Sequence, residues 1–171
     1  YIRMSEQMED YWMPTFPEVV GDVRGMNSNH GVAVVADCYA KGVRGFDLEK
    51  AYRACKGAIT EKTLAPWSAK KKGELDEFFV QEGYFPALAT GEEETVPEVH
   101  PFERRQPVSV TLGTVYDEWC LAQVANALGK EDEYRYFMDR SLNYKKIFHP
   151  ETKFFHPKDK YGQFVQPFDY R

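Results

Sequence analysis

The 171-residue sequence lacks the features that mark several common classes of protein. Its longest apolar run, residues 31–40, is broken by Asp37 and is much shorter than the roughly 18 residues that a membrane span requires. The net charge is −5 and no basic stripe is present, so a nucleic-acid surface has no support. There is also no glycine-rich phosphate loop and no Ser-His-Asp order. We therefore expect no membrane span and no nucleic-acid partner.

Cysteine is scarce, and the three that occur are an odd number that cannot all pair with one another. Cys38, Cys55 and Cys120 each lie in apolar, helix-like sequence without the spacing of a metal site. The four histidines are scattered along the chain. We expect three buried thiols and no metal-binding residue.

Aromatic residues are abundant, with 12 Phe, 11 Tyr and 3 Trp. Such a composition fits either an aromatic core or a carbohydrate-binding surface, and composition alone does not choose between them. The chain begins Tyr-Ile-Arg without an initiating Met or a charged leader. We expect it to be an internal segment of a longer protein.

The hydrophobic pattern predicts two helical hairpins. Residues 31–40 are apolar almost all round, which is typical of a helix buried on every side, and Gly42 would end it. Asp47 is a good N-cap for an amphipathic helix that follows. The same order returns later, with a mostly buried helix over 108–128 and an amphipathic helix over 131–148. A buried helix followed by an amphipathic one, occurring twice, predicts an inner and an outer layer.

The sequence therefore predicts a mainly α fold that is part of an (α/α)6 barrel. Its segments are an initial helix and loop (1–29), a first hairpin (30–62), a short helix and long loop (63–107), a second hairpin (108–148) and a short β-hairpin (149–171). The alternative is a non-catalytic repeat module of the tetratricopeptide type that binds protein or carbohydrate. Against it, the hairpins do not recur at the roughly 34-residue spacing of that class.

Polar residues at the starts of the inner helices are the candidate pocket residues. Asn29 and His30 precede the first inner helix, where the alternative role is helix capping. Asp37 lies on nearly the same face as His30 and needs a partner, for which Arg44 and Tyr116 are candidates.

The second inner helix carries Ser109 and Thr111 at its start. Asp117 and Glu118 are adjacent, so they point roughly 100° apart and cannot flank one bond as a catalytic pair. Trp119 is either a sugar-stacking platform or a core residue, and its apolar neighbours at helical spacing favour the core.

Four stretches of the chain follow a family pattern. Residues 26–52 begin Met-Asn-Ser-Asn-His-Gly and continue, after Val-Ala, with Val-Val-Ala-Asp-Cys-Tyr-Ala-Lys-Gly-Val-Arg-Gly-Phe-Asp. This resembles a signature of glycoside hydrolase family 92, Met-(Ile/Val)-Gly-(Asp/Asn)-His-(Ala/Ser) followed by a variant of Val-Ile-Ala-Asp-Ala-Tyr-x-Lys-Gly-Ile-Arg-x-Phe-Asp. The resemblance extends to Glu-Gly-Tyr-Phe-Pro at 82–86, to Ser-Val-Thr-Leu-Gly-Thr-Val-Tyr-Asp-Glu-Trp at 109–119, and to the tail at 143–155 and 167–169.

The departures from the pattern bear on specificity. Asn27 and Ser28 replace an aliphatic–Gly pair, Asn29 stands where Asp is common, and Gly113 replaces a Glu. The acidic stretch 91–100 has no counterpart in the family pattern.

The resemblance implies a calcium-dependent exo-acting α-mannosidase, many of which are specific for α-1,2 linkages. Such an enzyme joins an N-terminal β-sandwich to a catalytic (α/α)6 barrel and releases terminal mannose with inversion. In relatives the acid, the base and the calcium ligands follow the Pro-Phe-Asp segment at 167–169. We therefore assign no catalytic or metal residue here, and we expect the isolated segment to bind no calcium and to be inactive.

The resemblance also implies the surroundings of the segment. A mannose-containing glycan, the remaining barrel and the β-sandwich would be its partners in the parent enzyme, which would be secreted or periplasmic. Asn29 and His30 match the family's (Asp/Asn)-His pair and are the expected substrate-binding residues. Tyr84, Ser109 and Thr111 are further candidates on the same logic.

Overall fold

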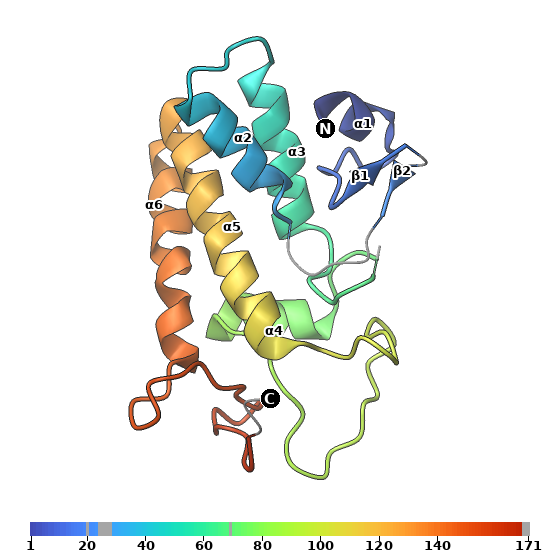
Figure 1. Ribbon diagram of the computed structural model, residues 1–171, viewed down its shortest axis with the longest axis vertical. Helices are drawn as coiled ribbons and strands as arrows, with labels where there is room; N and C mark the ends of the chain where they lie inside the picture. The colour runs from blue at the N-terminus through green and yellow to red at the C-terminus, as the bar shows by residue number, and fades with distance from the viewer. Residues whose placement is uncertain (20, 24–28, 69, 169–171) are drawn as a thin grey trace.

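A computed structural model describes residues 1–19, 21–23, 29–68 and 70–168, and the predictions made for residues 26–28 and 169 lie outside these ranges. The fold is mainly helical, as the sequence predicts (Figure 1). Its elements are α1 (Ile2–Gln7), β1 (Pro17–Glu18), β2 (Gly21–Asp22), α2 (Gly31–Ala40), α3 (Leu48–Thr60), α4 (Glu74–Glu82), α5 (Pro107–Ala127), α6 (Glu131–Arg140) and the 3-10 helix η1 (Ser141–Ile147). The antiparallel pair β1–β2 was not predicted. No helix of the described ranges has the length and apolar character of a membrane span.

α5 is the axis of the molecule, and two apolar clusters share it (Figure 1). Its second half packs against α2, α3 and α6, where Leu121, Val124 and Ala125 are at most 1% exposed. Its first half packs against α4 and the loops on either side of it, through Val110 and Val115. α2 and α5 run in the same direction, and the start of α2 lies beside the middle of α5 (Figure 1).

The first hairpin forms where its local signals place it. The Asp47 side chain accepts a hydrogen bond from the Lys50 N–H at 3.0 Å and caps α3. α2, however, is not buried on every side: Val34 is 42% exposed and Asp37 is also exposed. The prediction that all three cysteines are buried is wrong for Cys38, which lies on α2 and is half-buried, while Cys55 and Cys120 are buried.

The second hairpin differs from the prediction near its end. The expected helix over 131–148 is α-helical only to Arg140 and continues as η1. The Ser141 hydroxyl donates to the Met138 carbonyl at 2.7 Å, a local bond that competes with the α-helical pattern. Tyr144 and Phe148, in and just after η1, are about 40% exposed.

The predicted C-terminal β-hairpin is wrong for the described part of 149–171, which contains isolated bridges and no strand. The turn itself forms, since the Gly162 N–H donates to the Asp159 carbonyl at 3.1 Å. The Asp159 carboxylate also accepts from the backbone N–H of Tyr161 and of Gln163. Side-chain bonds thus replace part of the strand ladder, and Pro157 has no N–H to give.

Gly83, which ends α4, provides a test of the packing of α4 against η1. Its φ is +80°, and a Cβ there would lie 2.6 Å from the Asn143 side chain on η1. Gly91 has nearly the same φ, +82°, but nothing within 4 Å of its Cβ position. We expect Gly91→Ala to lower the free energy of unfolding by about 1 kcal/mol, from backbone strain alone.

Gly83→Ala should cost roughly 1–3 kcal/mol more, because Asn143 must also move. Chemical denaturation of both variants measures the difference. Equal losses would show that α4 and η1 do not pack as described.

Candidate functional site

The start of α2 is held against the middle of α5 by one buried carboxylate. Nδ1 of His30 lies 2.7 Å from Oδ1 of Asp117, and the Asn29 N–H donates to Asp117 Oδ2 at 2.6 Å. The Asp117 side chain is fully buried, whereas the His30 side chain is 54% exposed. Because a carboxylate only accepts hydrogen bonds, Nδ1 of His30 carries the proton and Nε2 is left facing outward from the pair.

Both members of the pair hold protons more tightly than usual. The hydrogen bond to Asp117 raises the pKa of His30 above its usual 6.5, against a smaller opposing effect of burial. Burial raises the pKa of Asp117, although the contacts with His30 and with the Asn29 N–H oppose this. The junction therefore binds a proton more tightly than a solvent-exposed histidine does.

The Asn29 side chain is also buried, at 4% exposure. Its Oδ1 has no hydrogen-bond partner within the described ranges. A buried amide oxygen needs a donor, and the described residues supply none to this atom.

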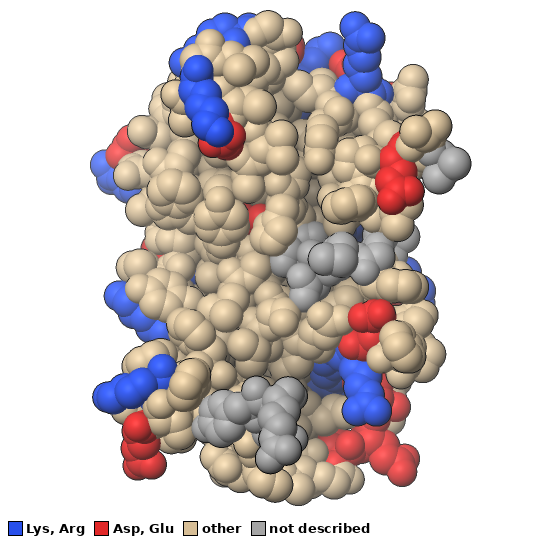
Figure 2. Space-filling model, viewed as in Figure 1, with Lys and Arg blue, Asp and Glu red and all other residues tan. Residues whose placement is uncertain are grey.

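Exposed aromatic rings continue the site along α5. The Tyr116 ring lies 5.9 Å from the His30 ring, edge to face, and stacks nearly parallel to the Trp119 ring at 6.4 Å. Tyr116 is 50% and Trp119 43% exposed, so the prediction that Trp119 is a core residue is wrong. Figure 2 shows that uncharged residues form most of the surface over α5, while charged side chains gather at its edges. His30, Val34, Tyr116 and Trp119 are called the α2–α5 face below.

The neighbouring carboxylate, Glu118, faces the other way. It accepts a hydrogen bond from Nε of Arg140 on α6 at 2.5 Å, and both side chains are largely buried. Burial raises the pKa of Glu118, and Arg140 opposes this. Arg140 also donates to the Val80 carbonyl at 3.0 Å, so this pair joins α5, α6 and α4.

The structure separates the five predicted substrate-binding residues. Asn29 and His30 come together at the α2–α5 junction. Ser109 is exposed at the start of α5, about 10 Å along the helix from Tyr116 by helical rise.

Thr111 and Tyr84 do not reach the surface, being 0% and 3% exposed. Thr111 accepts from the Phe85 N–H at 2.9 Å and donates to the Pro107 carbonyl, and the Tyr84 hydroxyl donates to the Asp159 carbonyl at 2.9 Å. These bonds fasten the loop after α4 to α5 and to the C-terminal segment.

The prediction that Arg44 or Tyr116 pairs with Asp37 is wrong. Asp37 is exposed and pairs with Lys41, one turn along α2, at 2.8 Å. Arg44 instead donates to the Tyr39 carbonyl at 2.6 Å. An exposed acid needs no buried partner, so the adjacent lysine suffices.

Sequence reasoning missed the role of Asp117, which it considered only as half of a catalytic pair. The available signal was an acid on a mostly buried helix, since such a group requires a partner. Nothing local identifies His30 as that partner, because it lies 87 residues away in the sequence.

No cluster of three or more His, Cys, Asp or Glu side chains able to hold a metal ion occurs in the described ranges. The residues of the α2–α5 junction do not fit a calcium site either, because the one buried carboxylate already binds His30 and Asn29. What the junction offers a ligand is hydrogen bonding and aromatic surface.

Exposed stacked rings beside hydrogen-bonding side chains are typical of proteins that bind sugars. Comparison with known proteins agrees with this class. The catalytic-domain profile of glycosyl hydrolase family 92 matches residues 1–171. The chain therefore belongs to this family. No curated protein sequence matched it.

Solved structures support the assignment. The family GH92 α-mannosidase BT3965 of Bacteroides thetaiotaomicron is 29% identical with a TM-score of 0.76, and the match covers 98% of this chain and 20% of that enzyme. The inverting mannosidase BT2199 of the same species is 26% identical with a TM-score of 0.77, with the same coverage. The chain thus spans about a fifth of the length of these enzymes and matches part of their catalytic domain.

The His30–Asp117 pair predicts a specific pH dependence. Because the folded pKa of His30 is raised, its stabilising effect is complete below pH 6.5 and is lost as the pH rises through the raised value. The raised pKa of Asp117 acts in the same direction. We expect the NMR titration of His30 to have a midpoint above 6.5, and stability to fall as the pH rises from 6.5 to that midpoint.

Asp117→Asn should lower the His30 midpoint, because the imidazolium loses its negative partner. Glu118→Gln, which alters the adjacent carboxylate, is the matched control and should leave the midpoint in place. A His30 midpoint insensitive to Asp117→Asn would contradict the described pairing.

Proposed function

We propose that the chain is part of an exo-acting α-mannosidase that removes terminal mannose with inversion, and that the α2–α5 junction lines its sugar pocket. The observation that carries the proposal is the placement of Asn29 and His30 beside exposed stacked rings. The family assignment and the similarity to an inverting mannosidase support the same reaction.

The junction supplies groups suited to a sugar. His30 is fixed through Nδ1, which presents Nε2 to a sugar hydroxyl, and the Asn29 N–H helps to hold the carboxylate that fixes it. Tyr116 and Trp119 offer flat apolar surface to the C–H groups of a pyranose ring. In this role the chain positions the substrate and does not carry out the chemical step.

The rest of the parent enzyme completes the proposal. The helical hairpins would belong to an (α/α)6 barrel, with α2 and α5 in its inner ring, facing a β-sandwich domain. Exposed apolar side chains outside the α2–α5 face, such as Val43, Tyr136 and Leu142, support contact with further parts of the parent. The catalytic acid, the base and calcium would be supplied by those parts, acting on a mannose-containing glycan, with α-1,2 linkages as the candidate specificity, in a secreted or periplasmic enzyme.

The role of His30 can be tested in the full-length enzyme. We expect His30→Ala to lower kcat/KM for an α-mannoside by about tenfold or more, equivalent to about 1.4 kcal/mol, because a substrate hydrogen bond is lost. His149→Ala, which removes a half-buried imidazole from the C-terminal segment, is the control. Unchanged kinetics together with a much lower melting temperature would assign His30 a purely structural role.

The chain by itself should not hydrolyse α-mannosides. The acid and the base are expected outside it, and the one buried carboxylate at the junction is engaged by His30 and Asn29. Incubating the purified chain with an aryl α-mannoside measures this directly. Release of mannose above the rate of the Asp117→Asn variant would show that the catalytic groups are present after all.

A further inference from the structure

A concave site lies at the foot of α5, apart from the α2–α5 face. It is a cavity of about 520 Å³. Its walls come from the loop after α4 and from the segment leading into α5, and they include Glu94, Val99, His100, Arg104, Arg105 and Pro107. A volume of this size is within the range of small-ligand pockets.

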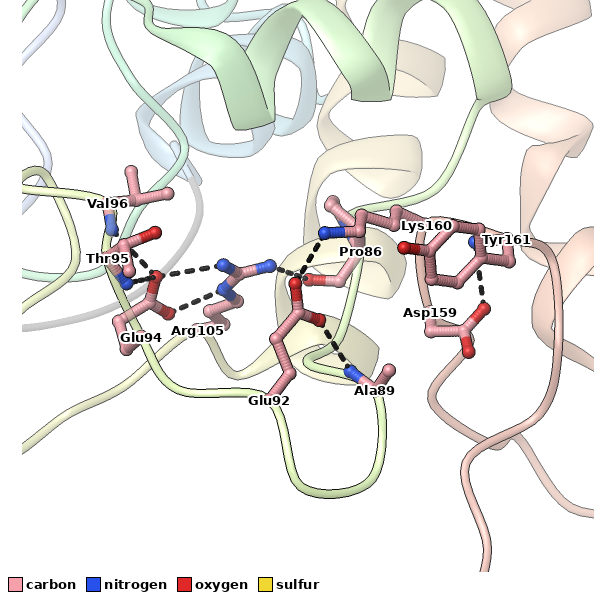
Figure 3. Close-up of polar contacts among 10 residues, drawn as sticks. All are labelled: Pro86, Ala89, Glu92, Glu94, Thr95, Val96, Arg105, Asp159, Lys160 and Tyr161. Atoms are coloured by element: carbon pink, nitrogen blue, oxygen red, sulfur yellow. Dashed lines mark hydrogen bonds and ion pairs between the residues drawn. The ribbon is translucent and has the colours of Figure 1, made fainter.

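The loop that forms this cavity is held in one shape by ion pairs (Figure 3). Arg105 binds Glu94 through two parallel hydrogen bonds of 2.6 and 2.8 Å, and its third nitrogen donates to the Pro86 carbonyl. Glu92 pairs with Lys160 of the C-terminal segment. Because Arg105 is largely buried and binds both oxygens of one carboxylate, the bidentate pair fixes the cavity wall before any ligand binds.

Backbone strain is concentrated around the same cavity. Arg104 and Gln106 have φ values of +57° and +46°, and Trp67, whose ring lies 5.3 Å from the His100 ring, has +61°. Such conformations in residues other than glycine persist only where surrounding contacts enforce them, and they are frequent at ligand sites. Two of the three residues line the cavity directly.

Side chains next to the lining residues suit a sugar ring. Trp67, whose ring contacts that of the lining residue His100, is 49% exposed, and Phe102, between the lining residues Pro101 and Glu103 in sequence, is 82% exposed. Arg104 makes no side-chain hydrogen bond or ion pair within the described ranges, so its guanidinium is available to hydroxyl groups. The aliphatic parts of the wall suit the apolar faces of a pyranose ring. The planar polar groups at the edge suit the hydroxyl groups around that ring.

We propose that this cavity is an additional glycan subsite that binds a mannose unit distant from the one cleaved. The inference rests on the proposed function. Ten residues of α5 separate Pro107 at the cavity from Asp117 at the junction, which places the two about 15 Å apart along the helix. The wall includes part of the acidic stretch 91–100, which has no counterpart in the family pattern. Such a subsite would give the parent enzyme a preference for longer glycans that relatives without this stretch lack.

The full-length enzyme tests the proposal with two substrates, a linear α-mannotetraose and an aryl α-mannoside. Arg104→Gly removes the guanidinium and relieves the positive φ, so it preserves folding. We expect it to raise KM for the tetraose roughly tenfold while kcat and the aryl mannoside kinetics stay within about twofold. Arg135→Ala, an exposed arginine on α6, is the control and should change neither.

The outcomes separate the two proposals. If Arg104→Gly changes both substrates equally or neither, the subsite is wrong whatever the reaction. If the wild-type enzyme hydrolyses neither substrate, the proposed function fails, and calorimetric binding of the tetraose then decides the subsite. If Arg104→Gly weakens tetraose binding roughly tenfold, the subsite proposal stands. If wild type and variant bind the tetraose equally, or neither binds it, the subsite proposal is wrong.

Discussion

Two adjacent carboxylates, Asp117 and Glu118, are buried at the centre of α5, and neither is tolerable there without a partner. Adjacent residues on a helix point about 100° apart, so the two acids face different neighbours. Asp117 holds the start of α2 through His30 and the Asn29 N–H, and Glu118 holds the end of α6 through Arg140. The Asp117 contacts join the first hairpin to the second, and the Glu118 contact joins the two helices of the second hairpin.

The same constraint shapes the candidate site. Because Asp117 is buried, it brings His30 to the boundary between the core and the α2–α5 face. Tyr116 precedes Asp117 on α5 and therefore lies beside the imidazole, and Trp119 follows one turn further. A structural demand of the core thus places an imidazole, a buried amide and two stacked rings together.

Much of the fold could be predicted from local signals. Gly42 and Gly129 follow the ends of α2 and α5, Asp47 caps α3, and the periodicity predicts each long helix to within about two residues at most ends. These signals depend on neighbours within one or two turns. The family resemblance likewise depended on sequence order and was confirmed by the catalytic-domain match.

The predictions that failed concerned features that depend on distant contacts or on competing side-chain hydrogen bonds. The apolar neighbours of Trp119 suggested burial, but whether a helix face is covered depends on elements far away in sequence. Similarly, the Asp159 side chain replaced strand pairing with a tight turn. The pairing of His30 with Asp117 spans 87 residues and has no local signature.

The most direct test of this account is the hydrogen exchange of the Asn29 amide, which donates to Asp117 Oδ2 at 2.6 Å. Asp117→Leu removes both acceptor oxygens while retaining a similar volume. The account predicts that exchange of the Asn29 amide accelerates by roughly tenfold or more relative to that of Val124, a buried α5 residue that reports global stability. If the two amides change in parallel, Asp117 does not hold the start of α2, and the central claim is wrong.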